Sequence, residues 1–156
     1  MAKIKQESFA ISVTGVGRKD YSQQVEYSVE PIVRSYQNAY VFDEVYAVQA
    51  GQTRTIDVNI PADTVVLLYD FLASIPSNRL IGFQVLAIDV AGGLANSIFG
   101  KAEYQRVEHH HSRGAPVFLV IRLVLTNYCD VDLDINVSLA GVYTGVQEYH
   151  QLVAAS

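Results

Sequence analysis

The feature that most constrains this chain is an alternation of apolar and polar residues with a period of two. It is clearest near the C-terminal end, where every second residue is apolar: Val131, Leu133, Ile135, Val137 and Leu139. Successive side chains of a strand point to opposite faces of a sheet, so this pattern predicts a strand with one buried face.

The same alternation, or a short apolar run, recurs along the chain at short spacing. It predicts strands at residues 9–13, 25–29, 40–49, 53–60, 64–70, 80–90, 102–108, 117–126 and 131–139. The pair 40–49 and 53–60 is expected to form a hairpin around a three-residue turn. Residues 91–100 and 109–114 are predicted to be loops, and 117–126 a central strand buried on both sides. No long helix and no internal repeat is visible.

Eight or nine short strands favour an all-β fold, and a single jelly-roll-like two-sheet sandwich of about eight strands fits best. An immunoglobulin-like sandwich is the main alternative, but it usually has a core Trp and this chain has none. We expect one β domain over residues 1–156. Its core is expected at about 8–143, with extended N- and C-terminal arms, flexible or partner-binding, at 1–7 and 144–156.

The composition excludes several classes of protein. Half of the residues are hydrophobic and 17% are charged, which excludes a disordered chain. Lys and Arg number 11 against 16 Asp and Glu, a balance opposite to that of most nucleic-acid binders. No apolar run has the length of a signal peptide or a membrane span, so we expect synthesis in a cytoplasm and no membrane partner. So few charges leave apolar surface exposed, which favours contacts between proteins.

Two clusters could bind a metal. His109 and His111 would share one side of an extended segment, and imidazoles bind transition metals. Asp132 and Asp134 belong to an alternating acidic run that begins at Asp130 and could offer oxygens to calcium. For the histidines, the favoured interpretation is a solvated loop. For the aspartates, it is the polar face of an outer strand. These four residues are therefore weak candidates, and no metal site and no cofactor is predicted.

No catalytic motif supports an enzyme. Cys129 could act as a nucleophile beside a histidine, but its flanking residues match no nucleophile motif, and a small buried cysteine is the simpler interpretation. A small β-barrel enzyme of cupin type would use His109, His111 and an acidic ligand. Such an enzyme would space its histidines and glutamate across separate strands with conspicuous glycines, a pattern that this sequence lacks.

Tyrosine is unusually common, with ten residues. Its apolar ring and polar hydroxyl suit half-buried positions and protein interfaces. We predict a partner interface that includes Tyr21, Tyr27, Tyr36, Tyr40, Tyr46 and Tyr149. Positions in the core or at its rim are one alternative. Stacking on sugars is another, and it would fit a carbohydrate-binding jelly-roll module of a spike or an enzyme.

The C-terminal third carries a resemblance to a known family. The run Leu123-Val124-Leu125-Thr126-Asn127-Tyr128 leads into Asp130–Asp134, and Ile135-Asn136-Val137-Ser138-Leu139-Ala140-Gly141-Val142 follows. These segments resemble small virion proteins of tailed bacteriophages, and residues 52–61 are similar to a jelly-roll strand of that kind. The resemblance covers about residues 40–143.

The family in question is the capsid decoration (cement) proteins. The resemblance implies a structural protein on the capsid exterior of a virion, made in the host cytoplasm. It implies that the chain forms a homotrimer and that its partner is a major capsid protein. No catalytic residue is implied, so the chain is expected not to be an enzyme.

Overall fold

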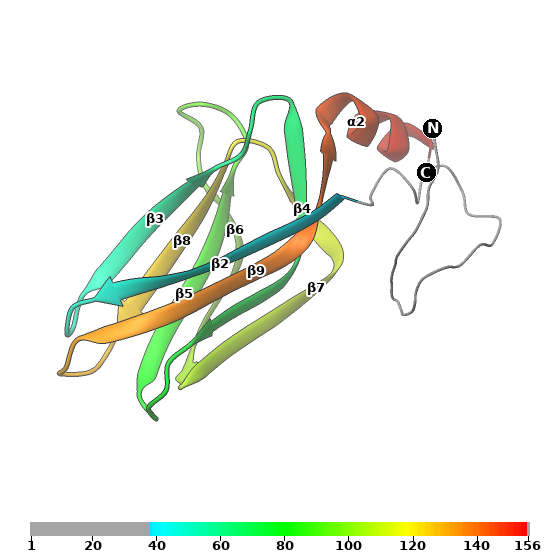
Figure 1. Ribbon diagram of the computed structural model, residues 1–156. Coiled ribbons are helices and arrows are strands. Elements are labelled where there is room, and N and C mark those ends of the chain that lie inside the picture. Colours follow the sequence, from blue (N-terminus) through cyan, green and yellow to red (C-terminus); the bar gives the residue numbers. More distant parts are fainter. Residues whose placement is uncertain (1–37, 156) are drawn as a thin grey trace, which may run out of the picture. The chain divides into compact units, whose positions relative to one another are not determined.

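The computed structural model describes residues 38–155, which form eight strands and one helix (Figure 1). In chain order they are β2 (Asn38–Val48), β3 (Thr53–Asn59), β4 (Thr64–Ser74), β5 (Leu80–Ile88), β6 (Asn96–Tyr104), β7 (Arg106–Val117), β8 (Val120–Asn127), β9 (Leu133–Gly145) and α2 (Val146–Ala155). The strands predicted at 9–13 and 25–29, and the arm predicted at 1–7, lie outside the described residues.

The strands pair as one long hairpin folded on itself. β2 pairs with β9, β3 with β8, β4 with β7 and β5 with β6, all antiparallel. Two further pairs, β4 with β9 and β5 with β8, roll this hairpin into sheets of order β2-β9-β4-β7 and β3-β8-β5-β6. This nested order is the topology of a single jelly roll. The predicted two-sheet sandwich is confirmed.

The core fills the space between the two sheets. In β8, Ile121, Leu123 and Leu125 are fully buried, whereas the residues between them are half-buried. This strand is central in its sheet but buries one face, so the prediction of burial on both sides is wrong. Two sheets that pack face to face leave their outer faces to solvent, which is why a period of two dominates the sequence.

The predicted hairpin of residues 40–49 and 53–60 is also wrong. The turn between them exists, since the amide of Gln52 donates a hydrogen bond to the carbonyl of Gln49 at 3.0 Å. The two strands then enter opposite sheets and pair with β9 and β8 instead. Alternation fixes which face of a strand is buried, but it does not specify the neighbouring strand.

Of the two segments predicted as loops, residues 91–95 are a loop and the remainder is strand. Residues 96–100 belong to β6 and residues 109–114 to β7. β6 and β7 are separated by the single residue Gln105, whose φ is +69°. Both strands lie at sheet edges with much of their surface in solvent, so their polar residues are compatible with sheet.

The C-terminal segment differs from the extended arm expected at 144–156. β9 continues to Gly145, and the next ten residues form α2 (Figure 1). Residues 146–155 contain neither Gly nor Pro and include good helix formers. The amide of Val146 donates to the carbonyl of Asp63 at 3.0 Å, and Tyr149 meets the ring of Phe118 edge-on at 5.6 Å. Within residues 38–155, no helix combines the length and apolar character that crossing a membrane requires.

Candidate functional site

The three consecutive histidines lie in β7, and each has different surroundings. His109 stacks on Phe99, with ring centroids 4.7 Å apart, and lies 5.9 Å from Phe71. His110 is on the other side of the strand, with its Nδ1 2.7 Å from Oδ1 of Asp70. The Nδ1 atom of His111 is buried without a hydrogen-bond partner.

The surroundings of His109 favour its neutral form. Desolvation among the aromatic rings lowers the pKa of this imidazole, and the positive charge of Lys101 lowers it further. The other two histidines of the run act in the same direction. A neutral ring stacked on Phe99 extends the aromatic cluster of the core to the edge of the sheet.

The acidic run is divided between a turn and a strand. Asp130 lies 3.3 Å from a guanidinium nitrogen of Arg79, and Asp132 accepts a 2.9 Å hydrogen bond from the amide of Ala50. Asp134 lies within β9. No group of three or more His, Cys, Asp or Glu that could hold a metal ion exists within residues 38–155. The weak candidates His109, His111, Asp132 and Asp134 are not brought together.

Cys129 bonds to a buried asparagine. Its Sγ lies 2.8 Å from Oδ1 of Asn127 and 3.4 Å from the carbonyl oxygen of Val131. Asn127 is fully buried at the end of β8, and its amide group also joins Val48 to this turn. These contacts stabilise the turn between β8 and β9, so the role of Cys129 is structural.

The described tyrosines of the predicted interface are half-buried. Tyr40 and Tyr46 pack against the core, and burial raises the pKa of both hydroxyls. The guanidinium of Arg54 lies 5.2 Å from the centroid of the Tyr46 ring. Tyr149 packs on Phe118. Tyr21, Tyr27 and Tyr36 lie outside the described residues, and the interface stays a prediction.

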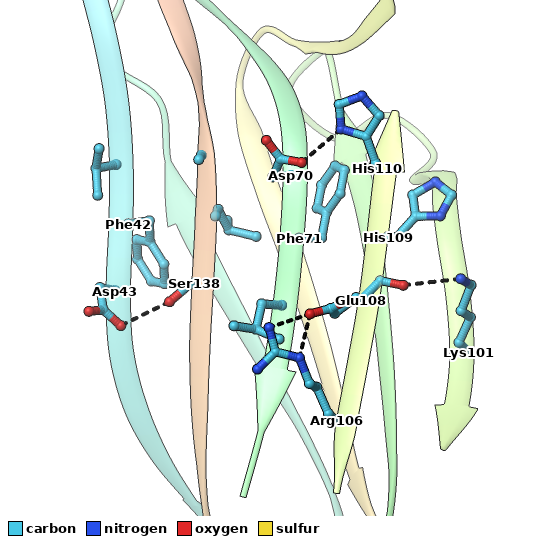
Figure 2. A pocket seen from close by; sticks show the side chains of 14 residues that line it. Phe42, Asp43, Asp70, Phe71, Lys101, Arg106, Glu108, His109, His110 and Ser138 are labelled. Carbon is cyan, nitrogen blue, oxygen red and sulfur yellow. Dashed lines mark hydrogen bonds and ion pairs between the residues drawn. The ribbon is translucent and has the colours of Figure 1, made fainter. Parts of the chain in front are cut away.

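A groove crosses the outer face of the β2-β9-β4-β7 sheet (Figure 2). Strand register aligns the outward residues of the four strands in rows. One row is Val41, Ala140, Asp70 and His110, and the next is Asp43, Ser138, Leu72 and Glu108. The groove has a volume of about 760 Å³ and extends past the β7 edge to Lys101 of β6.

Polar contacts across the strands organise the groove. The hydroxyl of Ser138 donates a hydrogen bond to Oδ1 of Asp43 at 3.1 Å, and Nδ1 of His110 is hydrogen-bonded to Oδ1 of Asp70 (Figure 2). Arg106 forms an ion pair with Glu108, and Nζ of Lys101 donates to the carbonyl oxygen of Glu108 at 3.0 Å. These groups surround an apolar strip formed by Val41, Ala140 and Leu72. The groove could therefore bind a ligand that is apolar along its length and polar at its end.

Sequence reasoning missed this groove. Its residues come from five strands, β2, β4, β6, β7 and β9, which are spread along the chain. Asp43 and Ser138, for example, are 95 positions apart. Their only signal is an outward acid in an alternating strand, and such acids are common on solvent-facing sheet surfaces.

Comparisons with known proteins give structural likenesses at low scores. No family model and no curated sequence matches the chain. The mitogen of Yersinia pseudotuberculosis superposes with a TM-score of 0.45 and 12% identity, over 66% of this chain and 85% of that protein. VP2 from a subviral particle of infectious bursal disease virus gives a TM-score of 0.39 and 13% identity, over 73% of this chain. Dimeric latent PorU from Porphyromonas gingivalis gives 0.32 and 10% over 71% of this chain.

The match covers 35% of VP2 and 14% of PorU, so this chain spans a minor part of either protein. A viral protein that builds a particle and a mitogen with a β fold are therefore among the proteins of similar structure. At TM-scores below one half, no function is transferred from them to this chain.

Proposed function

We propose that this chain is a structural virion protein that binds and stabilises a capsid as a decoration protein and assembles as a homotrimer. The proposal follows the resemblance of residues 40–143 to small virion proteins of tailed bacteriophages. Such a protein needs no catalytic group. A protein that binds the assembled shell but not its separate subunits stabilises the shell by mass action.

The observation that carries the proposal is exposed apolar surface on β2. Val41 and Val45 are 75% and 60% exposed, and both point outward from the same face of this strand. β2 is an edge strand with one hydrogen-bonded neighbour in the described part of the chain. Its eleven residues include no Pro, Lys or Arg, which are common protections of a solvent-exposed edge. Such a surface is suited to contact with another protein.

A second apolar surface lies in the loop between β5 and β6. Val90 is 65% exposed and Leu94 is 89% exposed. A decoration protein must contact both its own copies and the shell, so it needs more than one such surface. The loop and the β2 face supply two.

A carbohydrate-binding module is supported less well. Sugar platforms present the flat face of an aromatic ring to solvent. Of the predicted tyrosines that are described, Tyr40 and Tyr46 pack on the core, and Tyr46 has Arg54 beside its ring. Both side chains are half-buried.

Cosedimentation tests the proposal. The tag-free protein would be mixed with empty shells assembled from the major capsid protein encoded in the same genome, and with the unassembled subunits as the control. We expect saturable binding to shells, little binding to subunits, and a trimer mass by light scattering. A monomer that does not sediment with shells would overturn the proposal, as would a genome that encodes no capsid protein.

A further inference from the structure

The groove on the β2-β9-β4-β7 face has a shape suited to an extended segment. Its floor is made by the small side chains Ala140 and Ser138 of β9, between the outward residues of β2 and β4. β2 and β4 are two strand spacings apart, about 10 Å. A trough of this width admits one extended chain or one long side chain laid along β9.

The groove is open to solvent at its walls. On the β4 and β7 side, the side chains of Asp70 and His110 are 63% and 64% exposed. On the β2 side, Asp43 is exposed (Figure 2), as is Val41 two positions before it in the strand. A ligand could therefore reach both walls without rearrangement of the sheet.

Some carboxylates of the groove have Lys or Arg partners and others do not. Lys101 binds the carbonyl oxygen of Glu108, and Arg106 binds its carboxylate. Asp43 bonds to a serine hydroxyl and Asp70 to an imidazole. Within residues 38–155, neither of these two carboxylates has a Lys or Arg partner. The same residues contain six Lys and Arg against twelve Asp and Glu, a balance of −6, so the surrounding field also attracts cations.

The apolar strip between the two carboxylates narrows the class of ligand. Val41, Ala140 and Leu72 offer a surface for methylene groups, with a carboxylate on either side. Lysine and arginine side chains combine an aliphatic stem with a cationic head, and they bury the stem along apolar surface. Their N–H groups form charge-assisted hydrogen bonds with carboxylates. A neutral sugar would bring no positive charge to either carboxylate.

We propose that this groove binds a Lys- or Arg-bearing extended segment of the partner protein, with the cationic heads on Asp43 and Asp70. The identification of that partner as a capsid subunit rests on the proposed function. Binding of the basic segment itself does not. Alternate residues of an extended segment point to the same side, so two basic residues two positions apart could both face the groove.

The probe is the peptide acetyl-Ala-Lys-Ala-Lys-Ala-amide, with its bis-acetyllysine form as a control for charge. Binding to the full-length protein would be followed by amide chemical shifts. The test variant is Asp43→Asn with Asp70→Asn. The matched control is Glu44→Gln with Glu103→Gln, which changes the net charge equally. Glu44 follows Asp43 in β2 but points to the opposite side of the sheet, and Glu103 lies in the other sheet.

We expect shift changes centred on Ala140, Ser138 and Leu72, and at least a tenfold loss of affinity in the test variant. The control variant should change affinity by less than twofold, and the acetylated peptide should not bind. Three results would overturn the inference: no binding to the native protein, equal weakening by both double variants, or equal binding of the acetylated peptide.

The same variants separate this inference from the proposed function. Peptide binding by a protein that ignores shells would leave the groove site in place and remove the capsid role. Shell binding that is unchanged by Asp43→Asn with Asp70→Asn would keep the capsid role and reject the groove as its contact.

Discussion

Among residues 38–155, Asn127 is the polar residue whose loss is expected to destabilise the fold most. It is fully buried where β8 meets the turn into β9. Its Nδ2 donates to the carbonyl oxygens of Val48 and Val131 at 3.0 and 2.7 Å, and its Oδ1 accepts from the amide of Cys129 at 2.9 Å. One side chain therefore satisfies three backbone groups and joins the end of β2 to the turn.

The variant Asn127→Ala would leave these three groups without their partner. A buried polar group without a hydrogen bond costs about 1–3 kcal/mol. The carbonyl of Val48 belongs to a buried residue and should incur most of that cost, whereas Val131 is 42% exposed and its carbonyl can bind water. We therefore expect a loss of about 3–5 kcal/mol in the free energy of unfolding, a large part of the usual stability of a domain.

Urea denaturation at pH 7, followed by far-ultraviolet circular dichroism, measures this loss. The matched control is Asn136→Ala, a half-buried Asn on the outer face of β9, which should change the free energy of unfolding by less than about 0.5 kcal/mol. A loss of less than about 1 kcal/mol with an unchanged m-value would contradict this role of Asn127.

Three further predictions concern other parts of the fold. Because the pKa of His109 is lowered in the folded protein, the unfolded chain binds more protons, so stability should fall as the pH drops below about 6.5. His109→Phe should flatten that part of the urea-midpoint curve against pH, and an unchanged curve would contradict the assignment. Gly141→Ala would drive a methyl group into the backbone carbonyl of Leu67, so it should lose about 3 kcal/mol or more in urea denaturation, and a loss near zero would contradict the packing. Phe118→Ala removes the ring on which α2 docks, so amide hydrogen exchange in residues 146–155 should speed up while the sheets stay protected. Equal acceleration in the sheets would argue against separate docking of the helix.

Alternation predicted much of the β content of this fold. Each predicted strand within the described residues overlaps an observed one, and the period of two placed Leu133, Ile135 and Val137 correctly on the buried face. The errors came where composition was read in place of periodicity. Residues 91–100 contain three glycines and residues 109–114 are polar, so both segments were predicted as loops. Residues 96–100 and 109–114 nevertheless lie in the edge strands β6 and β7, and an edge strand tolerates polar residues on much of its surface.

Strand pairing was harder to predict than strand positions. A two-residue period gives no information on which strands become neighbours, and the jelly roll pairs the first described strand with the last. The groove depends on those distant pairs, because Asp43, Asp70 and Ser138 share a surface through strand order and register. For the histidine run, the sequence placed His109 and His111 on one side of an extended segment. It gave no means of foreseeing that Phe99 would occupy the space beside His109.

The proposed function depends on the outer faces of the two sheets. The core of the sandwich is apolar and closed, and the contacts of Cys129 and the acidic run are structural. Exposed apolar side chains on β2 and two carboxylates without a Lys or Arg partner in the described part of the chain lie on one outer face. A protein that works by binding alone needs such a face and little else.

Electron cryomicroscopy of shells mixed with an excess of the protein tests the proposed capsid decoration most directly. We expect added density on the outer surface around three-fold positions, with the β2-β9-β4-β7 face turned toward a basic segment of the shell. Undecorated shells at saturating protein, imaged beside a protein sample with intact fold, would contradict it.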